Sequence, residues 1–371
     1  MLILFAIIST ILLIASVLPL SYSQHYMVRG GDFIRLQICY GALINLLLIF
    51  SYAIFVTSSI PLIVMIGINL FVLILQGYWI YPYCWFARHE VKNSGPQAEH
   101  SIRIMSANVL MSNHHSDALI SLVKQHKPDL LITLESDLWW QNQLTALHND
   151  YPYRIACPKD NRYGMHVFSK YKIIQSQICE LVSDDIPSIH MLFENNAGLQ
   201  MQGHFIHPEP PSPTEKDSSR ERDSELIIVA KAVKNPIRPV IVAGDLNDVA
   251  WSRSTQLFMK LSGFLDPRKG RGFFNTFHAD YFFMRWPLDH LFHSPGFSVK
   301  CIKRLAKYGS DHFALLTELV YEDAQQQSLT EKDEDTDEIA QDLKMNGVNK
   351  HQVPTFKVTR AFNGPCAYLH Y

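Results

Sequence analysis

Residues 309–319 read GSDHFALLTEL, which sets an Asp-His pair directly before a run that alternates between apolar and small or polar side chains. Alternation of this kind is typical of a half-buried strand. A single Asp-His dipeptide is common, so Asp311 and His312 could simply end a loop. Whether they form part of a site depends on what the other strands of the chain carry.

Polar side chains stand at or just after the carboxyl ends of other predicted strands, where α/β folds usually build their sites. Taken singly, each could be a helix cap or a turn residue. Taken together with Asp311 and His312, they form an oxygen-rich set with two histidines, which suits metal-assisted phosphoester chemistry. These further residues are Asn108, Glu135, His207, Asp245, Asn247 and Asp289.

This set of side chains favours Mg²⁺ over zinc. Mg²⁺ prefers carboxylate and carbonyl oxygens and keeps several waters, so Glu135 and one or two aspartates could hold it without cysteine. Zinc is a poorer candidate because the sequence has no HExxH motif. In addition, the spacing of His204 and His207 on a strand would aim their rings to opposite faces.

The Asp-His stretch belongs to a segment that alternates strands and helices. SIRIMSANVL, SDALISLVKQH and KPDLLITLE predict a strand, a helix and a buried strand, which is a β-α-β start. Such alternation predicts one α/β domain with helices outside packed sheets. We expect further strands at 164–170, 189–194, 199–207, 239–245, 288–294 and 312–320, and helices at 224–234 and 252–263.

Composition divides the chain into four segments. Residues 1–86 are an expected membrane anchor, 87–100 a polar linker with a Gly-Pro break, and 101–321 the α/β domain. Residues 322–371 begin with an acidic stretch poor in apolar residues, which predicts a solvated, disordered tail.

Three long and almost uncharged stretches lie in the anchor, at 2–20, 34–56 and 60–80. A helix of about 20 apolar residues can cross a bilayer. YWIYPYCWF ends the third stretch with aromatic residues of the kind that settle at a membrane interface. The alternative for the first stretch is a cleaved signal peptide, but its amino end lacks the usual positive charge. We therefore expect three transmembrane helices.

Few charges bear on the orientation of the anchor. Arg29 and Arg35 flank the first connection, and Arg88 and Lys92 follow the third span. The positive-inside rule places both groups, and the α/β domain, in the cytoplasm of a cell whose inner membrane holds the anchor. A periplasmic domain stays open as the alternative. The formal net charge of the chain is −2, which excludes a broadly basic nucleic-acid binder.

The blocks SANVL, LLITLE, YGMHVFSK, GHFIHPEPP, VIVAGDLND, PLDHLF and GSDHFALL follow one another in the chain. In this order they resemble the endonuclease/exonuclease/phosphatase superfamily, the DNase-I-like metal-dependent phosphodiesterases and phosphatases, and in particular its membrane-anchored bacterial members. The resemblance covers roughly residues 101–321. It implies a four-layer αββα sandwich, with two mixed sheets face to face and helices outside.

The resemblance also implies a metal site. Carried over position by position, it makes Glu135 the principal Mg²⁺ ligand, with Asn108 and Asp311 near the same ion and Mn²⁺ as the alternative metal. The metal-ligand strand ends Gln-Glu in many nucleases but Leu134-Glu135 in this chain. We therefore expect one supporting contact of the metal ligand to be missing or replaced.

The catalytic roles follow from the same resemblance. Asp245 and Asn247 would orient the attacking water and the phosphate, and Asp289 would pair with His312. His312 would contact the scissile phosphate and act as a base or stabilise charge developing on it. His207 would protonate the leaving oxygen.

Several neighbouring residues are open between a site and a structural role. His204 is the alternative to His207, which we favour because it precedes a proline-rich turn. Asn113 and Asn161 could be site residues or turn residues, and the two roles are about equally plausible. For Arg220 and Arg222 a solvated role is favoured, and for His290 and His293 a structural role.

The sequence leaves the substrate open between nucleic acid and phospholipid. DPRKGRG at 266–272 and FFNTFHADYFFMRW at 273–286 offer basic and aromatic residues for a nucleic acid. The same aromatic cluster could dip into lipid and present a phospholipid head group, as in a sphingomyelinase or a head-group phosphatase. A non-enzymatic alternative is that the domain is an inactive membrane scaffold. All the polar residues that catalysis needs are present, which favours an enzyme.

Overall fold

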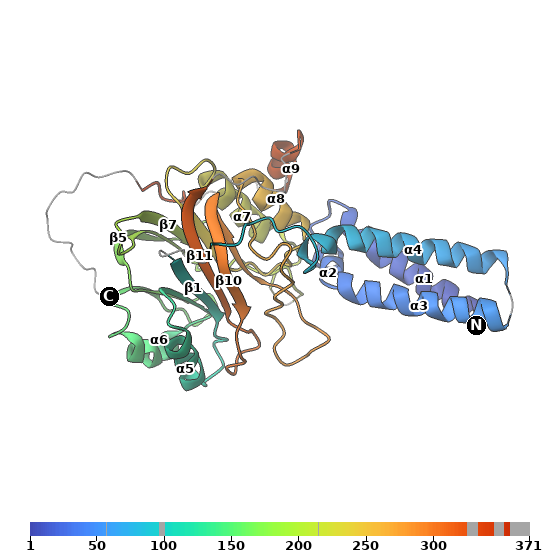
Figure 1. The fold of residues 1–371 in the computed structure, drawn as a ribbon, viewed down its shortest axis with the longest axis horizontal. Helices are drawn as coiled ribbons and strands as arrows, with labels where there is room; N and C mark the ends of the chain where they lie inside the picture. Colours follow the sequence, from blue (N-terminus) through green and yellow to red (C-terminus); the bar gives the residue numbers. More distant parts are fainter. Residues whose placement is uncertain (57, 96–100, 214, 325–332, 345–351, 357–371) are drawn as a thin grey trace.

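The protein consists of a helical bundle joined to an α/β domain (Figure 1). The computed structural model describes residues 1–56, 58–95, 101–213, 215–324, 333–344 and 352–356.

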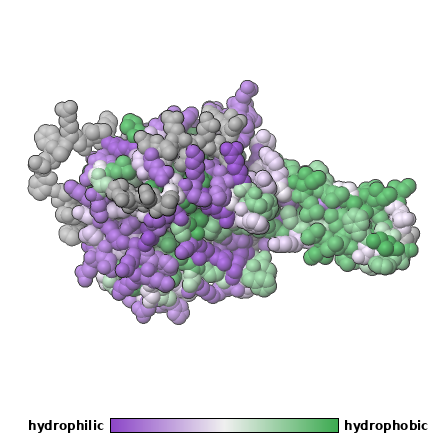
Figure 2. All heavy atoms as spheres, in the orientation of Figure 1, coloured by the Kyte–Doolittle hydropathy of each residue, from purple (hydrophilic) through white to green (hydrophobic). Residues whose placement is uncertain are grey.

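The bundle is formed by α1 (Leu2–Val17), α3 (Arg35–Phe55) and α4 (Ile60–Ile80). All three lie in segments that are long and apolar enough to cross a membrane. Figure 2 shows a largely hydrophobic outer surface along the bundle, in contrast to the mostly hydrophilic domain.

Polar side chains join the three helices inside the bundle. Asn45 and Asn69 each donate a hydrogen bond to the Ser9 hydroxyl, at 3.0 and 2.8 Å. Small and polar residues of this kind hold helices together where lipid removes the hydrophobic driving force. Because α1 supplies the shared acceptor, the hydrogen bonds of Ser9 join α1 to both other helices.

Short helices connect the bundle to the domain. The 3₁₀ turn η1 (Leu18–Leu20) and α2 (Tyr26–Phe33) lie between α1 and α3, and a second 3₁₀ turn, η2 (Tyr81–Tyr83), follows α4. The ring of His25 caps α2 by accepting a hydrogen bond from the Met27 amide at 3.3 Å. These connectors place the amino end of α3 and the carboxyl end of α4 beside the α/β domain (Figure 1).

The domain contains two mixed sheets. The first has the order β10-β11-β1-β2-β4-β3 and the second the order β5-β6-β7-β8-β9. β1 and β2 run parallel, as do β7 and β8, while the other neighbours are antiparallel. The strands are β1 (Ser101–Asn108), β2 (Leu130–Leu134), β3 (Tyr153–Cys157), β4 (Met165–Ser169), β5 (Lys172–Cys179), β6 (Ser188–Glu194), β7 (Gln200–Phe205), β8 (Val240–Asp245), β9 (Asp289–His293), β10 (Gly296–Arg304) and β11 (Leu315–Ala324).

One hydrophobic core lies between the sheets, and one covers the outer face of each. Ile104 and Ile132 of the first sheet share the inner core with Met191 and Ile241 of the second. The first sheet packs on α5 (Ser116–His126), α6 (Leu138–Gln143) and η3 (Leu144–Leu147). The second packs on α7 (Arg220–Ala232), α8 (Arg253–Ser262) and α9 (Thr336–Leu343). The predicted four-layer αββα sandwich is confirmed.

The strands that the sequence did not predict are β3, β5 and β10. All three lie at sheet edges. Edge strands pair on one side only and often carry polar residues and bulges, so their apolar pattern is weak. β5 and β10 each show a register shift against their neighbour.

The linker and the tail are more ordered than the sequence indicated. In the linker, Val91 is fully buried in the inner core, and Glu90 forms an ion pair with Lys269 at 3.0 Å. In the tail, α9 buries Ala340 in the core under α7 and α8. The prediction of a disordered tail is therefore wrong for the segment 333–344, which contains α9, although half of the helix residues are exposed. The rest of the predicted tail lies outside the described residues, apart from the end of β11 and the short stretch 352–356.

Candidate active site

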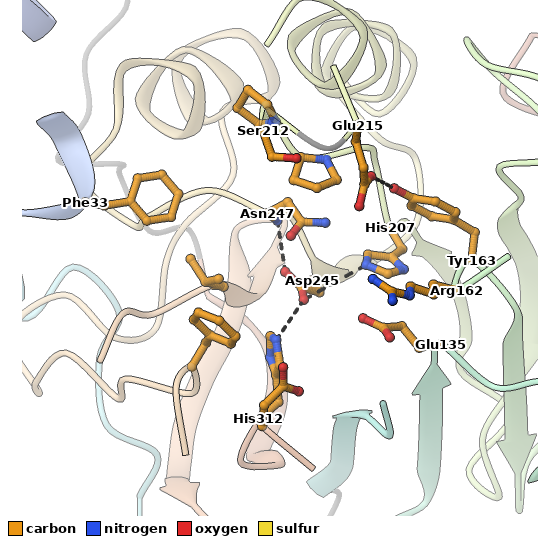
Figure 3. Close-up of a pocket in the computed structure, with 15 residues that line it drawn as sticks. Phe33, Glu135, Arg162, Tyr163, His207, Ser212, Glu215, Asp245, Asn247 and His312 are labelled. Atoms are coloured by element: carbon orange, nitrogen blue, oxygen red, sulfur yellow. Dashed lines mark hydrogen bonds and ion pairs between the residues drawn. The ribbon is translucent and has the colours of Figure 1, made fainter. Parts of the chain in front are cut away.

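A cavity of about 350 Å³ opens where the carboxyl ends of β1, β2 and β8 meet (Figure 3). Six of the eight predicted site residues line it. The other two are joined to these by hydrogen bonds: Asn108 to Glu135 and Asp245, and Asp289 to His312. The six lining residues are Glu135, His207, Asp245, Asn247, Asp311 and His312.

Strand pairing explains why these side chains meet. In the parallel pair β1 and β2, Asn108 lies opposite Leu134, which brings it next to Glu135. In the antiparallel pair β8 and β9, Asp245 lies directly opposite Asp289. Residues directly opposite on neighbouring strands have their β-carbons about 4.5–5.5 Å apart. The sheet register therefore sets two contacts of the site.

Gly244 allows β8 to reach the site. Its φ is +150°, and a β-carbon at this position would lie 1.9 Å from the Ile206 carbonyl oxygen. Any side chain would force the end of β7 away from β8. The glycine is therefore required for the close approach that places Asp245 beside the residues after β7.

Two site residues have left-handed backbone conformations. Glu135 has a φ of 57° and Asn247 a φ of 50°. Such conformations in residues other than glycine cost on the order of 1–3 kcal/mol each and cluster at functional sites. Asn247 is held by its amide, which donates to Asp245 Oδ1 at 2.9 Å, and by its side chain, which donates to the Pro208 carbonyl at 3.0 Å.

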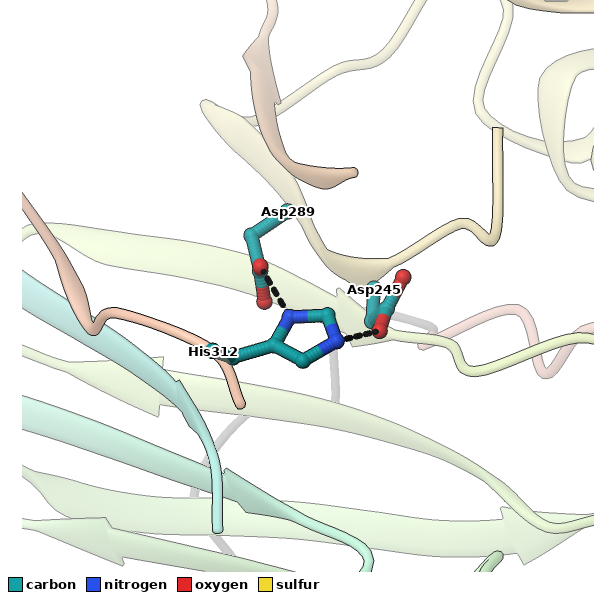
Figure 4. A group of neighbouring side chains, drawn as sticks. All are labelled: Asp245, Asp289 and His312. Carbon is teal, nitrogen blue, oxygen red and sulfur yellow. Dashed lines mark hydrogen bonds and ion pairs between the residues drawn. The ribbon is translucent and has the colours of Figure 1, made fainter. Parts of the chain in front are cut away.

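His312 lies between two buried carboxylates (Figure 4). Its Nδ1 is 2.8 Å from Asp289 Oδ2, and its Nε2 is 3.5 Å from Asp245 Oδ2. Burial alone would lower the pKa of His312, but Asp289, Asp245 and Asp311 together raise it to about 10. The imidazole is therefore a cation at neutral pH, and the same pairing keeps the pKa of the buried Asp289 below its usual range.

Asp245 joins the histidine to the opposite side of the pocket. Burial raises its pKa to about 7 against the opposing effect of His312. Asn108 donates from its side-chain amide to Asp245 at 3.1 Å and to Glu135 at 2.9 Å. Its Oδ1 accepts from the Leu110 amide at 3.1 Å. Asn108 is thus a donor between two carboxylates, and one of them is Glu135, the predicted metal ligand. Its position near the ion stays a prediction.

Glu135 has the features of a cation ligand. Its Oε2 is shielded from solvent and has no hydrogen-bond partner within the described part of the chain. Burial raises the pKa of this carboxyl, which means that its charge is poorly compensated by the protein. A divalent cation beside Glu135 Oε2, with Asp311 lining the same pocket, would supply the missing charge.

Ligand atoms of Asp245, Asp289 and His312 also lie within 4.8 Å of one another. We do not place the metal among them, because both ring nitrogens of His312 already face carboxylates. A histidine that is protonated on both nitrogens has no lone pair for a metal. These three residues form a relay of one hydrogen bond, between Asp289 and His312, and one ion pair, between His312 and Asp245.

His207, and not His204, lies in the pocket. His207 Nε2 is 4.0 Å from Asp245 Oδ2, and its ring packs 5.1 Å from the ring of Tyr163. His204 instead pairs with His190, with their Nδ1 atoms 2.8 Å apart. Burial and the charge of His312 lower the pKa of His207 to about 3, so its ring is neutral at neutral pH.

The structure adds residues that the sequence analysis did not place in the site. Arg162 and Tyr163 line the pocket directly after Asn161, which itself is a turn residue: its Oδ1 accepts from the Tyr163 amide at 3.0 Å. In the sequence, the only indication of their role was that Arg162 and Tyr163 directly follow Asn161, a candidate site residue. Phe277, which belongs to the aromatic stretch 273–286, also lines the pocket, as does Phe33 of α2, which no pattern in the sequence indicated.

Arg222 is a buried supporting residue, and the prediction that it is solvated is wrong. α7 begins at Arg220, before the predicted start, so Arg222 points inward and is 1% exposed. It pairs with Asp223 at 3.0 Å and Asp248 at 3.2 Å, and donates to the Asn247 carbonyl at 3.0 Å. It thereby holds the loop that carries Asn247.

Asn113 and His290, which the sequence left open between a site role and a structural role, make structural contacts. Asn113 donates to the Val109 carbonyl at 3.1 Å and accepts from the His115 amide at 3.0 Å, as a turn residue does. His290 lies 2.7 Å from the guanidinium of Arg268 and 2.9 Å from the Asp248 carbonyl.

The fold and the pocket are those of a DNase-I-like phosphoester hydrolase, and comparison of the sequence with protein families gives the same result. The model of the Endonuclease/Exonuclease/phosphatase family matches residues 105–312, more than half of the chain. The chain belongs to this family, whose members are metal-dependent phosphoester hydrolases.

Solved structures share the fold at low sequence identity. An endonuclease/exonuclease/phosphatase from Beutenbergia cavernae is 14% identical, with 60% of this chain and 72% of that chain covered and a TM-score of 0.50. TDP2 of D. rerio, solved with a single-strand DNA product, is 17% identical over 60% of this chain and 99% of that chain, with a TM-score of 0.49. A mannosyl-6-phosphatase from Bacteroides thetaiotaomicron is 19% identical over 59% and 100%, with a TM-score of 0.46. A comparison of the sequence with curated proteins found no match.

Proposed function

We propose that this chain is a membrane-anchored, Mg²⁺-dependent phosphoester hydrolase of the inner membrane, with Mn²⁺ as an alternative ion. One observation carries the proposal. A continuous set of hydrogen bonds and ion pairs runs from Asp289 through His312, Asp245 and Asn108 to Glu135 across a single pocket. At the end that lines the pocket, Glu135 Oε2 is buried and has no hydrogen-bond partner among the described residues, as a cation site requires.

In this proposal, Asp245 and Asn247 orient the attacking water and the phosphate. With its pKa raised to about 7, Asp245 can accept a proton from the water near neutral pH. His312, held as a cation by Asp289, stabilises the negative charge that develops on the phosphate oxygens. A cation is already protonated, which favours this role of His312 over that of a base.

His207 contributes as a neutral hydrogen-bond donor near the leaving oxygen. Its lowered pKa argues against the transfer of a full proton from a charged ring. Glu135, with Asp311 close by, would hold the divalent cation. That cation would supply Lewis-acid polarisation of the phosphoryl oxygen.

The test is hydrolysis of methyl 4-nitrophenyl phosphate by the full chain purified in detergent. We expect release of nitrophenol that needs added Mg²⁺, stops with EDTA and falls at least about 100-fold in Glu135→Ala. As a matched control, Glu194→Ala removes a carboxylate from the end of β6, outside the residues that line the pocket. Turnover that is indifferent to EDTA, or equal losses in both variants, would refute the proposal.

The charges near the site favour a phospholipid over a nucleic acid as substrate. The basic stretch at 266–272 is engaged internally. Arg268 pairs with Asp266 at 2.8 Å, Lys269 pairs with Glu90 at 3.0 Å, and Arg271 donates to the Val91 carbonyl at 2.6 Å. These cations do not form the free basic groove that nucleic-acid binding needs. A nuclease remains the second candidate, tested by metal-dependent cleavage of single-stranded DNA in the same preparation.

We also propose that the domain lies on the cytoplasmic side. Arg29 lies in α2 and Arg35 begins α3, while Arg88 and Lys92 follow η2, so all four lie where the bundle joins the domain. The positive-inside rule places this junction in the cytoplasm. A reporter enzyme that is active only in the cytoplasm should be active when it is fused after residue 92, and one that is active only in the periplasm should be inactive there. The opposite pattern would reverse the orientation.

A further inference from the structure

Two parts of the pocket lining are attached to the chain segment that leads into the second membrane helix. Phe33 of α2 lines the pocket, and its carbonyl accepts a hydrogen bond from the Trp286 indole at 2.5 Å. Another part of the lining comes from the segment that follows β7, with Pro210, Pro211, Ser212 and Glu215. That segment receives a hydrogen bond from the Tyr26 amide to the Asp217 carbonyl at 2.9 Å, and the Ser219 amide donates to Gln24 at 2.8 Å.

These attachments fix the level of the pocket relative to a bilayer. α3 begins at Arg35, two residues after Phe33, and has 21 residues. At about 1.5 Å per residue it is about 32 Å long, which matches the hydrocarbon thickness of about 30 Å. Phe33 is the last residue of α2, and only Ile34 separates it from the start of the span. The part of the pocket that Phe33 lines is therefore next to the end of the span, where the lipid head groups lie.

A run of exposed apolar side chains lies at the same level. We call residues 281–284 the aromatic patch; its members are Tyr281 (51% exposed), Phe282 (80%), Phe283 (59%) and Met284 (43%). The side chain of Gln37, the third residue of α3, donates to the Phe283 carbonyl at 3.0 Å. The loop between α8 and β9, which carries the patch, extends to the end of the bundle in Figure 1.

A contiguous apolar patch of this kind usually marks an interaction site. Aromatic side chains are enriched where a protein meets the membrane interface. Because the patch is bonded to the first turn of a membrane-spanning helix, the bilayer that holds this helix is the surface within reach. Continuity with the anchor thus identifies the partner as the lipid interface.

The loop that carries the patch also contacts the catalytic residues. The Ala279 amide donates to the Asp311 carbonyl at 2.6 Å, and the ring of Phe277 lies 4.9 Å from the ring of His312. The patch and the relay of His312 are therefore parts of one loop arrangement, and a head group beside the patch is next to the pocket.

We propose that the aromatic patch inserts into the membrane interface and that the pocket hydrolyses the phosphoester head group of an amphiphile in the same leaflet. This inference rests on the proposed hydrolase function and names its substrate class. In the reaction, a water oxygen bonds to phosphorus and the bond from phosphorus to the leaving oxygen breaks. One proton of the water goes to the protein and the leaving oxygen takes up a proton, so the products are a phosphate monoester and an alcohol.

The test compares two substrates that differ only in their membrane anchorage. Hexadecyl 4-nitrophenyl phosphate is held in phosphatidylcholine nanodiscs that also contain the full chain, and methyl 4-nitrophenyl phosphate is supplied in water. The measured quantity is the kcat/KM for the hexadecyl substrate divided by the kcat/KM for the methyl substrate. The patch variant is F282S/F283S, and the control is Ile237→Ser, which removes another exposed apolar side chain (94% exposed) from the connection between α7 and β8.

We expect the patch variant to lower the ratio at least tenfold and Ile237→Ser to leave it within twofold of the wild type. A ratio unchanged in the patch variant would overturn the inference, as would a wild-type chain that hydrolyses only the water-soluble diester. Either result would leave the proposed hydrolase function intact. Absence of Mg²⁺-dependent hydrolysis of both diesters would instead refute the hydrolase function itself.

Discussion

Replacing Arg222 by Met should destabilise the domain strongly, although Arg222 lies outside the pocket. Its guanidinium is 1% exposed and faces Asp223 and Asp248 at 3.0 and 3.2 Å. Removal of one partner from a buried ion pair costs about 3–5 kcal/mol. The Asn247 carbonyl also loses its donor. We therefore expect a loss of about 4 kcal/mol, which is about 10 °C in Tm for a domain of this size.

The loss should depend on pH. Burial already raises the pKa of Asp248 to about 6 even with Arg222 present. A carboxyl whose folded pKa is raised stabilises the fold below its unfolded pKa, and this contribution is lost as the pH rises through the folded value. Without Arg222 the pKa of Asp248 rises further, so Asp248 is protonated at pH 5.5 but costly to ionise at pH 8. The deficit in Tm should be larger at pH 8.

Thermal unfolding of the full chain in detergent, followed by tryptophan fluorescence, measures this effect. The double variant R222M/D248N should regain part of the lost Tm, because it no longer buries an uncompensated carboxylate. The reasoning would be refuted if Arg222→Met lowered the Tm by less than about 2 °C. It would also be refuted if the double variant were less stable than the single one.

Two further predictions concern buried titratable groups. Burial and nearby Glu209 raise the pKa of Glu225 to about 8, so its contribution to stability is full below its unfolded pKa and lost as the pH rises toward 8. Glu225→Gln should remove this decline, worth on the order of 4 kcal/mol, and a variant whose Tm falls with pH as the wild type does would contradict the assignment. His207→Ala should lower turnover of the soluble diester about 100-fold while His204→Ala stays within about threefold of the wild type, since only His207 lines the pocket. Equal losses of turnover in the two variants would contradict the assignment of His207, and not His204, to the active site.

The layers of the domain could be predicted from sequence because each central strand is buried and bounded by polar residues. β2 and β8 are buried along their whole length. Glu135 directly follows β2 and Asp245 ends β8, and it was their combination with the other polar strand ends, and not either residue alone, that indicated a site. Edge strands such as β5, which has exposed polar residues, gave no comparable signal.

Contacts between distant segments could not be predicted. Phe33 lies in the anchor, yet its carbonyl bonds Trp286 and its ring lines the pocket. No local pattern links two residues so far apart in the chain. Arg222 was misjudged for another reason: the helix begins four residues before its predicted start, which turns a solvated charge into a buried one.

The protonation states of the two site histidines could not be predicted from the motifs either. The sequence suggested His312 as base or charge stabiliser and His207 as proton donor. In the structure, three carboxylates raise the pKa of His312, whereas burial lowers the pKa of His207. His312 is therefore a cation and His207 is neutral at neutral pH. This difference depends on neighbouring side chains that only the fold brings together.

The charge of His312 is best tested by the turnover of methyl 4-nitrophenyl phosphate by His312→Ala. We expect a loss of about 10²–10³-fold in kcat, because the cation that stabilises charge on the phosphate is gone. His114→Ala, which removes an exposed histidine outside the pocket lining, should retain full turnover. A His312→Ala protein that is folded, as shown by its Tm, and turns over within twofold of the wild type would contradict the account.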